Sequence, residues 1–293
     1  MATLRVPAVL LCTSFVVLAG CTHQQPVAWQ GSDEMTKPIS MLPDTPVHSA
    51  VPLAQKAVSL VTPKAYAAHS GSTLGRRSFR VPILMYHYIR PMPGPRDKLG
   101  QGLTVTPETF AKQLDILQRK GYQTISFETL ADTGSVLPPK PIIISFDDGY
   151  QDAYDAAFPA LLKHHFTATF FIISGFVGKP NFATWDELRN MSGSGMDIEA
   201  HTVSHLNLSS LSHAQQEHEI KDSIAAIDDA LHIHVLALAY PAGRYNADSM
   251  KICREAGMKF AVTTHLGVAT DKYNTMELPR VRISEKSDFE RIF

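Results

Sequence analysis

Short apolar stretches alternate with longer amphipathic stretches from about Phe79 to the end of the chain. The apolar stretches are rich in β-branched and aromatic residues and predict strands near Val81–Met85, Gln123–Ser126, Pro141–Phe146, Ala168–Ile173, Asp197–Glu199, Val235–Ala239 and Lys259–Val262. The amphipathic stretches predict helices over Pro107–Lys120, Gln151–His164, Thr184–Met191, His213–His232 and Ala247–Ala256. A βα repeat of about seven such units predicts an α/β fold, a single distorted and incomplete barrel. The alternative is an open doubly wound sheet, but the sequence contains no glycine fingerprint for a dinucleotide and no P-loop.

The first 20 residues indicate a secretory signal peptide. Arg5 precedes the apolar stretch Val6–Ala19, and the residues Leu-Ala-Gly before Cys21 are typical of a bacterial lipoprotein cleavage site. A plain signal peptide or an uncleaved anchor is the alternative, although the apolar stretch is short for a membrane-spanning helix. Because Thr22 rather than Asp follows the cysteine, we expect the outer membrane rather than the inner one. The sequence thus predicts a protein of the bacterial cell envelope, lipid-anchored at Cys21 and facing the periplasm.

Residues 21–78 are rich in Pro, Ala, Ser, Thr and Gln and show no sustained apolar period. This composition predicts a Pro-rich disordered tether between the lipid and a folded domain over residues 79–293. Cys12 would leave with the signal peptide and Cys21 would carry the lipid, so the mature chain keeps only Cys253. We therefore expect no internal disulfide, and we expect Cys253 to be a small buried side chain.

The charge of the chain argues against nucleic acid as a partner. The formal net charge is -1 and 19% of the residues are charged, so no basic surface is expected. A neutral glycan fits this balance better than a polyanion. The predicted helix within Ser212–His232 carries several charges beside its apolar positions, and we expect them to be solvated: Glu217, Glu219, Lys221, Asp222, Asp228 and Asp229.

Two polar segments directly follow predicted strands. Asp147 and Asp148 end the strand Pro141–Phe146, and burying adjacent carboxylates is costly unless a cation lies beside them. His201 and His205 follow another strand, and one Asp with two His would give a divalent cation three protein ligands and open positions, as in catalytic sites. The second Asp is then free to act as a base. Alone, Asp-Asp-Gly is typical of a turn and a His-x-x-x-His pair is weak evidence, but together they favour a metal site.

The chain from about Phe79 to Ile283 resembles the polysaccharide deacetylases of carbohydrate esterase family four, also called the NodB-homology domain. The segments that carry the resemblance are Pro82–Ile89, Ile144–Tyr150, His201–His205 and Ala239–Tyr245. The first of these resembles the subgroup that includes the deacetylases of poly-N-acetylglucosamine. The resemblance implies the seven-stranded, distorted and incomplete (β/α)7 barrel of this family.

The resemblance also implies roles for individual residues. Asp147 would be the general base, and Asp148, His201 and His205 would be the metal ligands. In the subgroup, the histidine that corresponds to His87 is the general acid. In the family, a backbone N–H of the loop that corresponds to Pro241, Ala242, Gly243 and Tyr245 donates to the oxyanion.

One departure from the family pattern concerns the residue that orients the base. Many members have an arginine two residues before the proline of the third motif, where this chain has Ala239. Arg280 and Arg282 lie on the last apparent strand and point the same way by alternation, and we expect Arg280 to take the role. The alternative is that both are surface or rim charges. His265 is a second choice for the general acid, because no late Leu-His motif is present.

These features predict a metal-dependent hydrolase that removes N-acetyl groups from a cell-envelope or extracellular polysaccharide: poly-N-acetylglucosamine, a chitin-like polymer or peptidoglycan. The ligand types favour zinc, with cobalt, nickel, iron and manganese as alternatives. The alternatives in function are an O-acetyl polysaccharide esterase on the same site and a non-catalytic glycan-binding lipoprotein. We expect a monomer whose partners are the acetylated polysaccharide and, through the lipid, the membrane.

Overall fold

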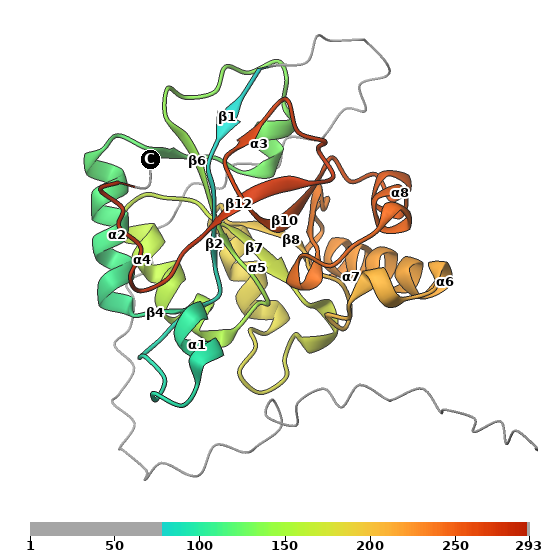
Figure 1. Cartoon of the computed structure of the whole chain (residues 1–293), viewed down its shortest axis with the longest axis horizontal. Helices are drawn as coiled ribbons and strands as arrows, with labels where there is room; N and C mark the ends of the chain where they lie inside the picture. The colour runs from blue at the N-terminus through green and yellow to red at the C-terminus, as the bar shows by residue number, and fades with distance from the viewer. Residues whose placement is uncertain (1–77, 292–293) are drawn as a thin grey trace, which may run out of the picture. The chain divides into compact units, whose positions relative to one another are not determined.

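The computed structural model describes residues 78–291, and a closed ring of seven parallel strands lies at their centre (Figure 1). Neighbouring strands follow the order β2, β12, β10, β9, β8, β7, β6, and β6 pairs with β2 to close the ring. The seven strands are β2 (Ile83–Tyr86), β6 (Pro141–Phe146), β7 (Thr169–Ile172), β8 (Asp197–Ala200), β9 (Ala237–Ala239), β10 (Phe260–Leu266) and β12 (Leu278–Arg282). This closure excludes the open doubly wound sheet and confirms the predicted (β/α)7 barrel.

The ring is irregular between β10 and β12. Their register shifts between Val262 and Leu266, and the connection between them carries the short strand β11 (Ala269–Thr270) in place of a helix. The strand predicted at Gln123–Ser126 forms as β5 (Gln123–Thr124), but it pairs with β6 from outside the ring. The seventh position in the ring belongs to β12.

Three further strands of two residues each were not predicted. They are β1 (Arg80–Val81), which pairs with β11, and β3 (Tyr88–Ile89), which pairs with β4 (Thr104–Val105). Two residues are too few to show an alternating pattern, so no signal for them exists in the sequence.

Helices surround the ring (Figure 1). They are α1 (Lys98–Leu103), α2 (Pro107–Arg119), α3 (Phe127–Ala131), α4 (Phe158–Lys163), α5 (Trp185–Gly193), α6 (His213–Glu217), α7 (Ser223–Leu231) and α8 (Ala247–Glu255). Their starts have local causes: the Thr106 hydroxyl accepts from the Thr109 N–H, and Thr184 forms a capping box with Glu187. Two predicted helices are interrupted by π-helical turns, η2 (Ala153–Ala157) before α4 and η5 (His218–Asp222) between α6 and α7.

Alternation along the strands divides the apolar residues into two clusters. One cluster joins the outer face of the ring to the helices, and it includes Leu84, Ile144 and Phe170. The other lies inside the ring and includes Ile83, Ile143 and Phe171. The interior is covered where the strands begin by α3, because the Phe127 ring of that helix contacts Phe171 and Phe260. The opposite end, where the strands finish, is thus the end available for chemistry.

The residues expected to direct the protein to a membrane fall outside the described part of the chain. These are the predicted signal peptide, Cys21 and all but the last residue of the tether. Among the described residues, no helix combines the length and apolar character needed to cross a bilayer. Cys253 is buried in α8, as predicted.

Candidate active site

Asp147 and Asp148 lie where β6 ends, at the carboxyl-terminal side of the ring. Both are buried, and the Asp147 N–H donates to the Tyr86 carbonyl and so extends the pairing with β2. The chain then turns sharply, with φ of 78° at both Asp148 and Gly149. A Cβ at Gly149 would lie 3.0 Å from the end of the Ile172 side chain, a tight contact, and the positive φ favours glycine there. The turn sends the two carboxylates to different partners.

Asp147 is held by Arg280 of β12, inside the ring. The guanidinium donates from Nη1 to Oδ1 at 2.6 Å and from Nη2 to Oδ2 at 2.7 Å, and from Nε to the Thr263 carbonyl at 2.9 Å. Burial alone would raise the pKa of the Asp147 carboxyl, but the charge and hydrogen bonds of Arg280 outweigh it and hold that pKa well below its usual range. Asp147 is therefore an oriented carboxylate at neutral pH.

Asp148 faces two histidines instead. Its Oδ1 lies 3.3 Å from His201 Nε2 and 3.6 Å from His205 Nε2, and one ligand atom from each residue lies within 4.8 Å of the other two. That Oδ1 is buried and has no hydrogen-bond partner. A buried carboxylate oxygen without a donor, facing two imidazole nitrogens, fits a divalent cation bound among the three.

The surroundings of the two histidines differ: burial keeps His205 neutral, whereas at His201 the contact with the Asp148 carboxylate outweighs burial and raises the pKa. The His201 Nδ1–H donates to the Ala239 carbonyl at 2.7 Å, which directs Nε2 toward Asp148. Burial, and then His201, lower the pKa of His205 to about 4, so its ring is neutral at neutral pH and has a lone pair to offer. Neutral imidazole is the form that binds metals.

The loop between the two histidines is fixed by Glu219, a residue whose role the sequence did not reveal. The Glu219 carboxylate accepts from the Ser204 N–H at 2.8 Å, and its carbonyl accepts from the Val203 N–H at 3.1 Å. These bonds support a strained loop, because Thr202 and His205 have φ of 66° and 58°. The expectation that this charge is solvated was wrong, since Glu219 is 3% exposed. The π-helical turn η5 shifts the helix phase and turns Glu219 inward, and the sequence gives no sign of this turn.

His87 follows β2 and lies beside Asp147. Its Nε2 is 4.0 Å from Asp147 Oδ2 and its side chain is 14% exposed. Burial lowers its pKa, and the carboxylates of Asp147 and Asp148 oppose part of that effect. The alternative acid, His265, is exposed on β10, with its ring 6.4 Å from that of Tyr245. The structure thus brings His87 to Asp147 and gives His265 no such contact.

Arg280 and Arg282 differ in their surroundings. Arg280 is 1% exposed within the ring, whereas Arg282 is exposed where β12 ends. The charge of Arg282 still reaches His87 and lowers its pKa further. Of the two arginines, Arg280 is therefore the one that contacts Asp147.

The loop Pro241–Tyr245 follows β9 beside this site. Its first three residues form η6 (Pro241–Gly243), with φ of 49° at Ala242 and 66° at Gly243. A Cβ at Gly243 would lie 2.2 Å from Thr264 Oγ1, so only glycine fits there. The N–H groups of Gly243 and Arg244 donate within the turn, to Tyr240 and Pro241, which leaves the N–H groups of Ala242 and Tyr245 as candidate donors for an oxyanion.

Tyr245 anchors this loop. Its ring stacks on that of Tyr240 with centroids 4.4 Å apart, and its hydroxyl donates to Glu277 Oε1 at 2.8 Å. Both partners lie just outside strands, Tyr240 after β9 and Glu277 before β12, so in this structure Tyr245 holds the loop shape around Ala242.

Comparison with known proteins gives consistent matches. Residues 134–261 match the family model described as Polysaccharide deacetylase. YxkH of Bacillus subtilis, a candidate polysaccharide deacetylase, is 35% identical over 208 residues, which are 70% of this chain and 72% of that protein. The poly-beta-1,6-N-acetyl-D-glucosamine N-deacetylase of Staphylococcus aureus is 32% identical over 53% of this chain and 58% of its own length. The solved structure of the Streptococcus pyogenes deacetylase PplD in complex with acetate superposes with a TM-score of 0.69 at 32% identity, covering 73% of this chain and 96% of PplD.

The buried pair of Arg280 and Asp147 predicts a large loss of stability when only one partner is removed. Arg280→Leu leaves the Asp147 charge buried and unpaired, so we expect the free energy of unfolding to fall by about 3–5 kcal/mol in urea titrations. Arg282→Leu, on the same strand but exposed, is the matched control and should change it by roughly 0.5 kcal/mol or less. Combining Asp147→Asn with Arg280→Leu should recover part of the loss. An Arg280→Leu protein as stable as the Arg282→Leu control would contradict the pairing.

Proposed function

The chain belongs to the polysaccharide deacetylase family, and we propose that it is a metal-dependent hydrolase that removes N-acetyl groups from a cell-envelope or extracellular polysaccharide. The observation that carries this proposal is the separation of the two carboxylates: Arg280 holds Asp147, while Asp148 faces His201 and His205. Asp147 is thereby kept apart from the cation and can transfer a proton, and Asp148 is available as a ligand.

The three residues Asp148, His201 and His205 would hold a divalent cation, most simply zinc, because zinc favours imidazole nitrogen and carboxylate oxygen. Cobalt, nickel, iron or manganese would accept the same ligands. When bound, such a cation polarises an acyl carbonyl and makes water more acidic. Three protein ligands leave room for substrate, as catalytic sites require.

The chain's own residues perform the remaining steps. Asp147 accepts a proton from the attacking water on a carboxylate that Arg280 keeps ionised and oriented. The Ala242 N–H donates to the developing oxyanion. His87 protonates the departing amine. Burial lowers the pKa of His87, so its ring must gain a proton before it can protonate the amine. Asp147 lies 4.0 Å away and can pass on the proton that it has taken from the attacking water.

As substrate we propose poly-N-acetylglucosamine first, and chitin-like polymers or peptidoglycan second. The proposal is supported by the name of the Staphylococcus aureus relative and by the near-neutral charge of this chain. A panel of acetate-release assays tests it, using N-acetylated and O-acetylated forms of these glycans with metal-depleted and metal-restored protein. We expect N-acetyl glycans to release acetate only after metal is restored. Release of acetate from O-acetyl glycans alone would identify an esterase. If no glycan released acetate, the proposal that the protein is an enzyme would be refuted.

The position of His87 predicts that the effect of removing its side chain depends on the leaving group of the substrate. His87→Ala should lower turnover of an N-acetyl glycan by roughly 10²–10⁴-fold, because an amine leaves poorly without a proton. An activated aryl acetate, whose leaving group needs no proton, should be hydrolysed at close to the wild-type rate, and metal content should not change. Near wild-type rates on both substrates would remove His87 from the mechanism and make His265 the candidate.

We also propose that the mature protein is a lipoprotein, anchored through Cys21 at the outer membrane and facing the periplasm. The support is the sequence Leu-Ala-Gly before Cys21 and the Thr that follows it. Metabolic labelling with a fatty acid should mark the wild type, and Cys21→Ser should abolish the label and leave the precursor unprocessed. The absence of label on the wild type would contradict lipidation.

A further inference from the structure

Two tyrosines, Tyr88 and Tyr150, lie with their hydroxyl groups together next to the proposed metal ligands, and we call them the tyrosine pair. The Tyr88 hydroxyl donates to that of Tyr150 at 2.9 Å, and the two ring centroids are 4.3 Å apart. Tyr88 directly follows His87, and Tyr150 comes two residues after Asp148. The two tyrosines are 62 positions apart in the chain, and the pairing of β2 with β6 brings their loops together.

The other neighbour of the Tyr150 hydroxyl is the Asp148 carboxylate. Burial raises the pKa of Tyr150, and the charge of Asp148 and side-chain hydrogen bonds with Tyr88 and Asp148 raise it further. The phenol therefore keeps its proton at neutral pH. Because the Tyr150 oxygen already accepts from Tyr88, its own O–H is free to donate to the Asp148 carboxylate. Asp148 Oδ1 has no hydrogen-bond partner, so the oxygen that faces the histidines stays free for a cation.

Tyr150 is fixed in place by its ring and by its backbone. Its ring lies against that of Phe182 as well as that of Tyr88, with the Phe182 centroid 5.0 Å away. Its backbone forms an antiparallel bridge with Phe182, and the Gly149 carbonyl beside it accepts from the Ala183 N–H at 3.0 Å. A side chain held in this way keeps one orientation, as a group that orients a metal ligand must.

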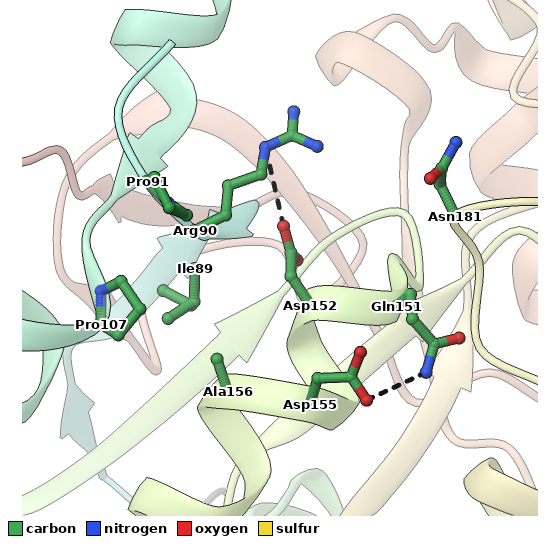
Figure 2. Close-up of a pocket in the computed structure, with 9 residues that line it drawn as sticks. All are labelled: Ile89, Arg90, Pro91, Pro107, Gln151, Asp152, Asp155, Ala156 and Asn181. Carbon is green, nitrogen blue, oxygen red and sulfur yellow. Dashed lines mark hydrogen bonds and ion pairs between the residues drawn. The ribbon is translucent and has the colours of Figure 1, made fainter. Parts of the chain in front are cut away.

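Tyr88 is held from the outer side by Arg90. The Arg90 guanidinium lies over the Tyr88 ring, 3.4 Å from its centroid, and its Nε is 3.7 Å from Asp152 Oδ2. Figure 2 shows Arg90 facing Asp152 at the edge of a cavity of about 410 Å³ that both residues line. A continuous series of contacts therefore leads from this cavity to the metal-ligand side chain: Asp152, Arg90, Tyr88, Tyr150 and Asp148.

We propose that the tyrosine pair orients Asp148 for the bound cation, with Tyr150 as the positioning residue and Tyr88 as its support. A hydroxyl that donates to the Asp148 carboxylate restrains its rotation, so Oδ1 stays directed toward His201 and His205. Tyr150 thus does for Asp148 what the Ala239 carbonyl does for His201. Hydrogen bonds of this kind, made to a ligand rather than to the metal, change metal affinity by about 10–100-fold. This inference rests on the proposed function and adds the residues that hold one of its ligands.

The experiment measures how strongly the zinc-loaded full chain retains zinc against increasing concentrations of a chelator, without substrate. Tyr150→Phe keeps the ring and removes only the hydroxyl, so we expect the dissociation constant for zinc to rise roughly 10–100-fold. Tyr88→Phe leaves Tyr150 without its donor and should raise it by roughly 2–5-fold. Tyr154→Phe is the matched control, because its hydroxyl accepts from Asn190 Nδ2 at 2.9 Å and its ring packs against the outer apolar cluster. The control should retain zinc as the wild type does.

The visible absorption of the cobalt-substituted protein is a second readout, because its bands report the ligand geometry. We expect these bands to shift in Tyr150→Phe and to stay in place in Tyr154→Phe. A purely structural role for the tyrosine pair would lower the free energy of unfolding in urea and leave both the zinc affinity and the cobalt bands unchanged.

The possible outcomes separate this inference from the proposed function. A wild type that binds zinc, together with a Tyr150→Phe protein of equal zinc affinity and identical cobalt bands, overturns the positioning role alone. A Tyr150→Phe protein that differs only in its unfolding in urea also overturns it. If Tyr150→Phe does not fold, Tyr88→Phe decides, and an unchanged zinc affinity there overturns the proposal. A wild type that binds no divalent cation refutes the metal dependence in the proposed function itself.

Discussion

Two adjacent buried carboxylates at the end of one strand determine the rest of this site. Asp147 and Asp148 would repel each other strongly in a dry environment unless each had its own positive partner. The backbone separates them by turning through positive φ at Asp148 and Gly149. Arg280 then satisfies the first carboxylate completely, and Asp148 is left with a buried oxygen that no donor reaches. In the proposed function a cation would meet this deficit, and two neighbouring residues of the same type would then have different chemical roles.

The barrel makes this division possible because it brings together residues that are distant in the chain. Arg280 is 133 residues from Asp147, and its guanidinium is held inside the ring by the Thr263 carbonyl and beside the Phe171 ring. Ring closure between β2 and β6 places His87 next to the same carboxylate. A sheet open between β2 and β6 would leave β2 at one edge and β6 near the other, and the contacts of His87 and Arg280 with Asp147 would not be enforced.

Much of this arrangement could be predicted because its signals are local. The apolar run Pro141–Phe146 identified the strand that carries both carboxylates, and alternation along Leu278–Arg282 put Arg280 and Arg282 on one face without separating them. A seven-stranded barrel was predicted, but one of its strands was assigned wrongly. The structure has β12 in the ring and leaves Gln123–Ser126 outside it, because strand pairing depends on partners that are distant in the chain. Glu219 was missed because a single π-helical turn changes which side of a helix faces inward.

The measurement that tests the division between the carboxylates most directly is the metal content of two purified variants after equal metal loading. Asp147→Asn removes a charge from the residue that Arg280 holds, so it should retain metal at the wild-type stoichiometry while losing most activity. Asp148→Asn weakens a ligand, so it should lose metal and activity together. Equal metal loss in both variants would contradict the account, because it would mean that Asp147 and Asp148 serve the cation jointly.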